Sequence, residues 1–366
     1  MPALTPGGAE KLLLRMVSYD SINEHMVISL SANNPLLNEF EGVGIKVTIC
    51  NINHLFLAPL SLFRLWLHLR KIQPKVLMCW LYHGCAIGSL ISLCNLKHRV
   101  IWCIHNANLD RKVVSWKVRV SAYWCSLLSH LLPDKIVYCS DSAAKYHMDL
   151  GYEPSVGSII YNGIPSEEFF YDSYERTKFR KYIGVGETDL IICCIARFDL
   201  QKDHGNLFSA LSLLKHEYLI KFKLVLCGSN MNPENTKLIE MIKNHGLISE
   251  SILLGSVRNL QSVYCGSDIC VLSSRSEALP NVIGEAMLCK VFCVSTSVGD
   301  IPKIIGSEGW LVEPMNPSKL AEAIYDSYVK LNNFDAIAMK ERARNRILKH
   351  FSFERMMNDY DAIWSK

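Results

Sequence analysis

Two carboxylates stand between two apolar runs in the second half of the chain. Glu277 and Glu285 are eight residues apart, and the runs 268–273 and 291–295 on either side are typical of short buried strands. The segment between these strands is therefore predicted to be a loop followed by a helix. This placement would let both carboxylates surround one phosphate-bearing ligand.

A helix is predicted to start at Asn281, with Pro280 at its first turn. A proline suits the first helical turn, where its missing N–H costs nothing, so the free N–H groups around Asn281 and Val282 point out of the strand ends. Such groups at a helix start form a ready site for phosphate. We therefore expect Leu279, Asn281 and Val282 to lie at the ligand.

A pair of cations follows another apolar run, 189–196. Arg197 and Lys202 are five residues apart, in a loop at the predicted carboxyl end of a strand that should neighbour the strand before Glu277. A bidentate guanidinium and a point-charge ammonium can neutralise a diphosphate that must leave as an anion. A phosphate-bearing ligand could therefore contact these cations as well as the helix start.

Alternating strands and helices position these loops. A chain of 366 residues is longer than one core usually supports, and 49% hydrophobic with 20% charged residues is typical of globular proteins. Predicted strands, separated by helical segments, cover 26–30, 46–50, 76–81, 100–104, 135–139 and 158–161, then 189–196, 222–227, 251–254, 269–273, 291–295 and 310–312. This α/β pattern is typical of doubly wound parallel sheets, which bind ligands outside the carboxyl ends of their strands.

The stretch S-R-S-E-A-L-P-N-V-I-G-E-A-M (274–287) resembles the E-x7-E signature of retaining glycosyltransferases of family 4. The resemblance implies a GT-B fold, with two Rossmann-like doubly wound domains facing a central cleft. It implies an acceptor domain over 1–167, a nucleotide-sugar domain over 168–350 and a last helix, 351–366, that crosses back to the first domain. By resemblance, Glu277 lies at the donor sugar, Glu285 binds the ribose hydroxyls, and Arg197 with Lys202 grips the pyrophosphate.

Weaker parts of the resemblance add three more sites. Gly7 and Gly8 match the glycine turn that faces the donor phosphates, where a missing side chain and a helix start favour close approach. His105 stands where relatives carry a histidine near the reacting sugar. The loop after 251–254 matches the family's base-recognition loop, which implies that the backbone near Val257 meets the base.

The sequence also departs from the family pattern. Ala278, Lys290 and Asp300 stand where glycines are usual, so the loop at Ala278 must avoid positive φ or accept strain. Relatives have a full strand before the glycine turn, whereas residues 1–6 contain two prolines and cannot form a central strand. We therefore expect the first strand of the N-terminal sheet to be missing or truncated.

No metal or further cofactor is expected. Asp359-Tyr360-Asp361 mimics a D-x-D metal motif, but residues two apart in a helix point to different faces. The 14 cysteines form no C-x-x-C pair and lie mostly in apolar runs, which indicates buried free thiols in a reducing cytosol. The co-substrate is a nucleotide-diphosphate sugar, with UDP preferred.

The first half is basic over a long stretch. Between Glu41 and Asp134 the only acidic residue is Asp110, and aromatic residues are mixed with the cations Lys46, Arg64, Arg70, Lys71, Lys75, Lys97, Arg99, Arg111, Lys112, Lys117 and Arg119. This mixture of basic and aromatic residues suits binding to an anionic membrane surface. Nucleic acid is a competing partner, and a third interpretation is that these residues form ordinary solvated helix faces. The membrane is favoured over nucleic acid because no nucleic-acid motif accompanies the basic residues. Residues 76–94 could be a transmembrane helix, but a buried strand followed by a buried helix explains them better.

These features predict a cytoplasmic, metal-independent retaining glycosyltransferase at the inner face of the membrane. Its acceptor would be a glycan or a lipid-linked sugar, as in the synthesis of lipopolysaccharide, O-antigen or capsule. Two alternatives stay open: a GT-B nucleotide-sugar epimerase, and a non-catalytic subunit that binds the nucleotide sugar.

Overall fold

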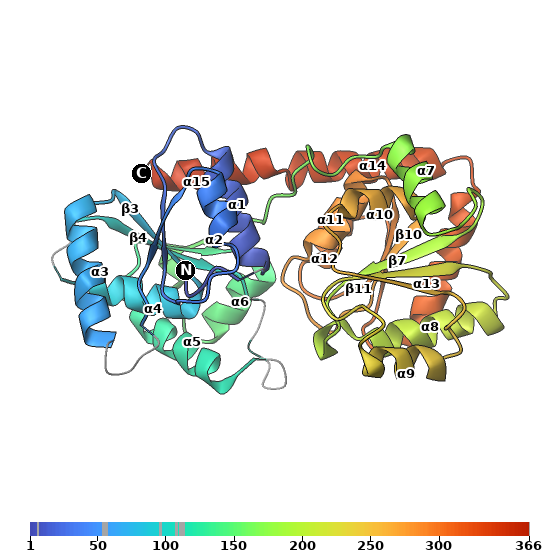
Figure 1. Ribbon diagram of the computed structural model, residues 1–366, viewed down its shortest axis with the longest axis horizontal. Helices are drawn as coiled ribbons and strands as arrows, with labels where there is room; N and C mark the ends of the chain where they lie inside the picture. Colours follow the sequence, from blue (N-terminus) through green and yellow to red (C-terminus); the bar gives the residue numbers. More distant parts are fainter. Residues whose placement is uncertain (6, 53–57, 95–96, 107–108, 110–113, 366) are drawn as a thin grey trace. The chain divides into compact units, whose positions relative to one another are not determined.

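The computed structural model describes the chain except for residues 6, 53–57, 95–96, 107–108, 110–113 and 366. It divides into two compact units: unit 1 is Met1–Tyr161 with Asp359–Lys366, and unit 2 is Asn162–Asn358. The paired strands of both units are parallel and are covered by helices (Figure 1). The prediction of two Rossmann-like α/β domains is therefore confirmed.

Unit 1 contains two sheets, with strand orders β1-β2 and β3-β4-β5-β6. Its strands are β1 (Met26–Ser29), β2 (Lys46–Ile49), β3 (Val76–Trp80), β4 (Arg99–Ile104), β5 (Lys135–Tyr138) and β6 (Gly157–Ile159). Its helices are α1 (Gly8–Tyr19), α2 (Leu37–Gly42), α3 (Ala58–Ile72), α4 (Leu81–Ser92), α5 (Trp116–Leu128) and α6 (Asp141–Asp149). Among the described residues before α1, none belongs to a strand. The Met1 ammonium nevertheless donates to Ile28 O (3.0 Å) and Leu30 N donates to Met1 O (3.0 Å), so Met1 pairs alongside β1.

The apolar segment 76–94 divides into β3 and α4, as the sequence analysis favoured. Trp80 at the end of β3 and Tyr82 at the start of α4 are both buried. A search of the described residues finds no helix with the length and apolar character needed to cross a membrane.

Unit 2 contains one sheet with the order β12-β11-β10-β7-β8-β9. The strands are β7 (Ile191–Ile195), β8 (Lys223–Cys227), β9 (Ser251–Gly255), β10 (Ile269–Leu272), β11 (Phe292–Thr296) and β12 (Trp310–Val312). The helices are α7 (Ser173–Tyr182), α8 (His204–His216), α9 (Thr236–Asn244), α10 (Leu260–Gly266), α11 (Asn281–Leu288), α12 (Ile301–Ile305), α13 (Pro317–Leu331) and α14 (Ala336–His350). A last helix, α15 (Phe353–Trp364), begins in unit 2 and ends in unit 1.

Helices cover both faces of this sheet: α8, α9 and α13 lie on one side, and α10, α11 and α12 on the other (Figure 1). Strands covered on both faces must be apolar along their whole length, and β7, β10 and β11 are buried at every position. The strand order reverses between β7 and β10, so the loops after these strands diverge at the switch point where such sheets bind ligands.

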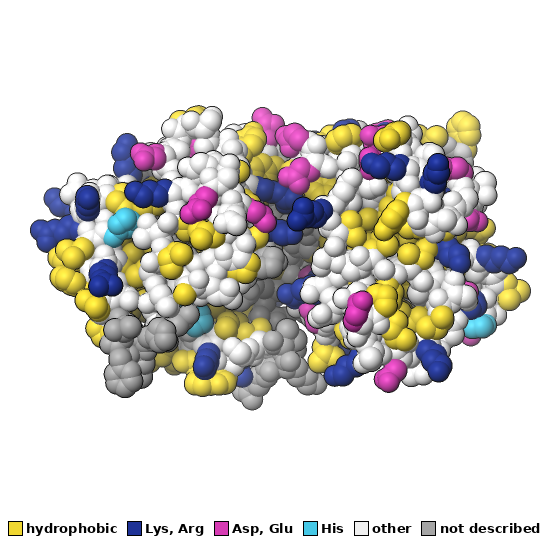
Figure 2. All heavy atoms as spheres, viewed as in Figure 1, with side chains coloured by type: hydrophobic (Ala, Val, Ile, Leu, Met, Phe, Trp, Pro, Cys, Tyr) yellow, Lys and Arg dark blue, Asp and Glu magenta, His cyan; other side chains and the backbone are white. Residues whose placement is uncertain are grey.

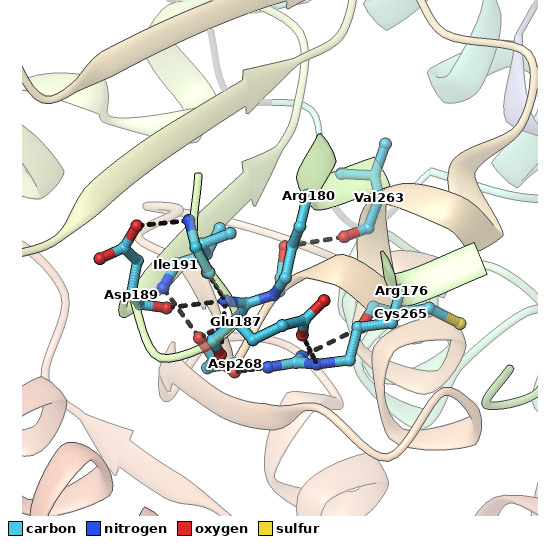
Figure 3. Close-up of polar contacts among 10 residues, drawn as sticks. Arg176, Arg180, Glu187, Asp189, Ile191, Val263, Cys265 and Asp268 are labelled. Carbon is cyan, nitrogen blue, oxygen red and sulfur yellow. Dashed lines mark hydrogen bonds and ion pairs between the residues drawn. The ribbon is translucent and has the colours of Figure 1, made fainter. Parts of the chain in front are cut away.

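A buried ionic cluster fixes the opposite, amino ends of the same two strands (Figure 3). Asp268, just before β10, accepts from Arg176 Nη2 (3.0 Å), Arg180 Nη2 (2.8 Å) and the backbone N–H of Ile191 (2.9 Å). Arg180 is 1% exposed and also donates to three backbone carbonyls. Helix α7 is thereby tied to β7 and β10.

Candidate active site

The loops after β7 and β10 are joined at the switch point. The backbone N–H of Arg275 donates to Gln201 O (2.8 Å), and Gln201 Nε2 donates to Ser276 O (2.6 Å). Ser273 Oγ donates to Lys202 O (2.9 Å). These bonds bring the two predicted motifs, which are far apart in the sequence, to one edge of the sheet.

Lys202 and Glu277 form an ion pair between these loops. Lys202 Nζ lies 2.5 Å from Glu277 Oε1, which also accepts from Ser274 Oγ (2.6 Å). Glu277 is 8% exposed, so the carboxylate is held in a largely dry position. The Lys202 ammonium has three N–H donors and uses one of them here, so it can contact a phosphate at the same time.

A second ion pair between the loops was not predicted from the sequence. Arg275 Nε donates to Asp203 Oδ2 (2.8 Å) and Nη2 donates to Oδ1 (3.0 Å), and this hydrogen bonding raises the pKa of Arg275. Asp203 is buried and adopts a left-handed backbone conformation (φ 47°, ψ 55°), which is rare for a residue with a side chain. The spacing of Arg275 and Asp203 carries no motif, so only the fold reveals this clamp.

Arg197, the other predicted cation, lies on the same loop but is mostly exposed. Its Nη2 pairs with Asp199 Oδ2 (2.9 Å), and the side chain of Asp199 also caps the short turn Leu200–Lys202 by accepting from Lys202 N (3.1 Å). A solvent-facing guanidinium held at one side by a carboxylate can still turn toward an anion. The position of Arg197 agrees with a diphosphate site but leaves its role a prediction.

Helix α11 begins at Asn281, the start given by the sequence analysis. Pro280 is its N-cap, with an extended backbone (φ −77°, ψ 114°), and Asn281 is the first helical residue, followed by Val282. An N-cap residue has non-helical angles, which the fixed φ of proline permits. Asn281 Oδ1 is buried and makes no hydrogen bond to the described residues, and Leu279 just ahead of it is buried as well.

Gly299 keeps the Glu277 loop in place. It has φ +56°, and a Cβ there would lie 2.1 Å from the carbonyl oxygen of Glu277. Asp300 N donates to Ala278 O (3.0 Å), so the loop after β11 closes over the loop after β10. Ala278 is not among the residues with positive φ, whereas Lys290 does adopt φ +59° where the family has glycine.

Glu285 lies in the fifth position of α11 and is 6% exposed. The phenol of Tyr264, on α10, donates to Glu285 Oε2 over 2.9 Å, and burial raises the pKa of Tyr264 well above its ordinary value. Tyr264 was not predicted, since a separation of 21 positions from Glu285 matches no helical or strand period. It fixes one carboxylate oxygen of the residue that is expected to bind ribose.

His204, which follows Asp203, is buried among apolar rings. Its ring lies 5.3 Å from that of Phe198 and 6.2 Å from that of Phe208, and neither ring nitrogen has a hydrogen-bond partner among the described residues. Burial lowers the pKa of the imidazole to about 4. The neutral ring therefore packs beneath the cation loop as an apolar residue does.

Val257 lies in the loop between β9 and α10, two strands away from β7. Its side chain lines a surface cavity of about 400 Å³ together with Phe179 and Tyr182 of α7. The loop is at the carboxyl end of the sheet, as a base-recognition loop requires, and this role remains a prediction.

The remaining predicted residues belong to unit 1. Gly7 is the N-cap of α1 and Gly8 its first residue, and the Glu10 carboxylate folds back over Gly7, where a Cβ would come within 2.3 Å of Glu10 Oε2. His105 follows β4 and stacks on Trp80, with ring centroids 4.9 Å apart and an angle of 3° between the planes. The roles of these three residues toward a donor remain predictions.

Across the part of the chain that the structure describes, no group of three or more His, Cys, Asp or Glu side chains is arranged to hold a metal ion. The D-x-D segment lies inside α15, with Tyr360 buried. All 14 cysteines are free thiols, and Cys94 is the exposed one.

Two family models match consecutive parts of the chain. Glycosyltransferase Family 4 matches residues 6–168, and Glycosyl transferases group 1 matches residues 175–346. The first match covers most of unit 1, and the second covers the loops that carry Arg197, Lys202, Glu277 and Glu285.

Individual relatives are distant. N-acetyl-alpha-D-glucosaminyl L-malate synthase of Bacillus anthracis is 29% identical over 209 residues, which are 56% of this chain and 52% of that enzyme. The chain thus spans about half the length of this relative. An uncharacterized 41.2 kDa protein in the cps region of Klebsiella pneumoniae is 24% identical over 271 residues, 73% of this chain and 71% of that protein.

A solved structure covers the full chain. Alr3699/HepE of Anabaena in complex with UDP superposes with a TM-score of 0.86 over 100% of both chains, at 18% sequence identity. The same protein in complex with UDP-glucose superposes with a TM-score of 0.84 over 99% of this chain and 97% of that one, at 18% identity. At this identity the likeness establishes the shared fold.

Proposed function

We propose that this chain, which glycosyltransferase family models match over residues 6–168 and 175–346, transfers a sugar from a UDP-sugar donor to a glycan or lipid-linked acceptor, with retention of configuration and without a metal ion. The observation that carries the proposal is the Lys202–Glu277 ion pair at the switch point of unit 2. The ammonium of Lys202, which we propose binds phosphate, lies beside the buried carboxylate of Glu277, which we propose holds a sugar hydroxyl. The likeness to a protein crystallised with UDP and UDP-glucose supports the choice of nucleotide.

The proposed mechanism uses side chains of unit 2 to stabilise the leaving diphosphate. Lys202, Arg197 and the N–H groups at the start of α11 neutralise the charge that develops as the sugar–phosphate bond breaks. Glu277 orients the donor sugar, and Glu285, held by Tyr264, binds the ribose. The leaving phosphate takes the proton of the acceptor hydroxyl, which attacks from the same face, so no strong protein base is required.

We further propose that the enzyme works in the cytoplasm at the inner face of the membrane, in the synthesis of a surface polysaccharide such as lipopolysaccharide, O-antigen or capsule. The basic, aromatic-rich sequence between Glu41 and Asp134 supports this location. The relative in the cps region supports the pathway class.

The test begins with a thermal-shift screen of nucleotide sugars, since a ligand that binds the folded state raises the melting temperature. The stabilising donor is then incubated with candidate acceptors in the presence of EDTA, and the product is analysed by proton NMR. An α-linked product from an α-linked UDP sugar supports the proposal. A β-linked product contradicts retention, complete loss of activity in EDTA contradicts metal independence, and a changed sugar still attached to UDP without acceptor indicates an epimerase.

A further inference from the structure

Helix α5 of unit 1 turns its large apolar side chains outward. Its buried residues are small: Ala122, Cys125 and Ser126. Five of its large apolar residues are exposed by 45% to 67%, and Leu131, in the turn that follows, is 84% exposed. We call these exposed residues the α5 stripe: Trp116, Val120, Tyr123, Trp124, Leu127 and Leu131.

The α5 stripe is continuous along one side of the helix. Its members follow one another at intervals of one, three or four residues, so they share one face of an α-helix. A surface helix of a globular domain normally shows the reverse arrangement, with its apolar face toward the core. A contiguous exposed apolar face of this kind is typical of an interaction site.

The helix is anchored to unit 1 through its small-residue face. Cys125 Sγ donates to Tyr82 O (3.3 Å), and the hydroxyl of Tyr152 donates to Ala122 O (2.9 Å). At its beginning, Ser115 caps the helix by accepting from Val118 N. The stripe therefore belongs to a fixed platform and cannot be buried by a simple rotation of α5.

The charges around the stripe fit an anionic partner. Lys117 and Arg119 lie on α5, and the sequence from 42 to 133 contains a single acidic residue, Asp110. Helix α3 repeats the combination, with exposed Phe63 and Leu67 beside Arg64. Figure 2 shows hydrophobic side chains mixed with Lys and Arg at the left of the view, where Figure 1 has α3. Tryptophan and tyrosine favour the headgroup region of a bilayer, and basic residues are attracted to its anionic lipids.

We infer that the α5 stripe docks unit 1 on a bilayer that contains anionic lipid, with the helix lying in the plane of the surface. The 13 residues of α5 are too few to span the hydrocarbon core, which needs about 20. The apolar stripe enters the interface while the flanking cations stay with the headgroups. This inference rests on the proposed function and gives its membrane contact a specific element, so that a lipid-linked acceptor would be met at unit 1.

The test measures binding of the full chain to sedimenting vesicles of phosphatidylcholine with or without phosphatidylglycerol. We expect binding to the anionic vesicles, a blue shift of tryptophan fluorescence, and weaker binding at high salt. Trp124→Ala/Leu127→Ala should weaken vesicle binding about tenfold, because two apolar side chains that would enter the bilayer are removed. Trp124→Glu/Leu127→Glu should weaken vesicle binding further. The matched control, Phe334→Glu/Ile337→Glu, changes two exposed apolar residues of unit 2 and should bind as wild type does.

The inference would be overturned if both Trp124/Leu127 variants bound vesicles as tightly as the wild type, or if the wild type bound neutral and anionic vesicles equally. Binding of the wild type to single-stranded DNA without binding to vesicles would overturn it too. A dimer that both stripe variants convert to a monomer, without any vesicle binding, would also overturn it. UDP binding and UDP-sugar hydrolysis are measured on the same variants, which are expected to keep both. Loss of vesicle binding with hydrolysis intact supports the inference, whereas absence of hydrolysis in the wild type concerns the proposed function alone.

Discussion

The ammonium of Lys202 lies 2.5 Å from the carboxylate of Glu277, and this contact joins the loops after β7 and β10. Each loop alone offers an ordinary charged side chain. Together they place the Lys202 cation beside a buried carboxylate, at the end of the sheet where the strand order reverses. The predictions that follow depend on this arrangement and on the contacts that support it.

Replacing Lys202 by methionine should lower kcat/KM for the UDP sugar about 100-fold, because the leaving diphosphate loses one stabilising donor in a largely dry site. Steady-state assays of UDP release measure this. Lys319→Met removes a lysine that pairs with Glu322 on the surface of α13, and it should leave kcat/KM unchanged. Equal activity of the two variants would remove Lys202 from the mechanism.

Tyr264→Phe should raise KM for the donor about three- to tenfold with little change in kcat. The substitution deletes the hydroxyl that holds Glu285, and an unpaired buried acceptor costs roughly 1 to 3 kcal/mol. Tyr174→Phe, at an exposed tyrosine on α7, is the matched control. A drop in kcat with unchanged KM would mean that Tyr264 does not act through nucleotide binding.

His204 should make unit 2 sensitive to mild acid. Burial lowers its pKa from 6.5 to about 4, so between these values the unfolded state binds more protons than the folded state. Stability should therefore fall as the pH decreases from about 6.5 toward 4, by on the order of 2 kcal/mol from this group. Between pH 7 and pH 5, the melting temperature of His204→Leu should fall less than that of the wild type. The melting temperature of His216→Leu, a variant at an exposed site, should fall as much as that of the wild type. If the melting temperature of His204→Leu fell as much as that of the wild type, groups other than His204 would account for the acid sensitivity.

Asp268→Asn should lower the free energy of unfolding by about 3 kcal/mol, because Arg180, which is 1% exposed, would keep its charge without its carboxylate. Chemical denaturation followed by circular dichroism measures the change. Glu322→Gln breaks an exposed pair and should change stability by less than about 0.5 kcal/mol. Similar midpoints for the two variants would mean that the cluster in Figure 3 contributes little.

Sequence reasoning found the parts of the site that depend on strand order. Arg197 and Lys202 follow one apolar run and Glu277 follows another, and the doubly wound pattern makes these two strands neighbours. Apolar runs also predicted the strands of unit 2 to within about two residues, since strands covered on both faces are apolar throughout.

The contacts made across the fold could not be predicted in this way. The Arg275–Asp203 clamp and the Tyr264–Glu285 bond join residues with no periodic relation, and Asp203 adopts a left-handed conformation that its residue type does not favour. The orientation of the apolar face of α5 could not be predicted either, because periodicity shows that a helix has an apolar face but not whether this face points to the core or to solvent.

The most direct test of the central claim is the turnover of a UDP sugar by Glu277→Gln beside the wild type, with UDP affinity measured by calorimetry on both. The substitution keeps the size of the side chain and removes the charge that faces Lys202 and, in the proposed mechanism, the donor sugar. The account predicts that kcat falls about 100-fold while the Kd for UDP changes less than about threefold. Unchanged turnover in Glu277→Gln, with the wild type active, would contradict it.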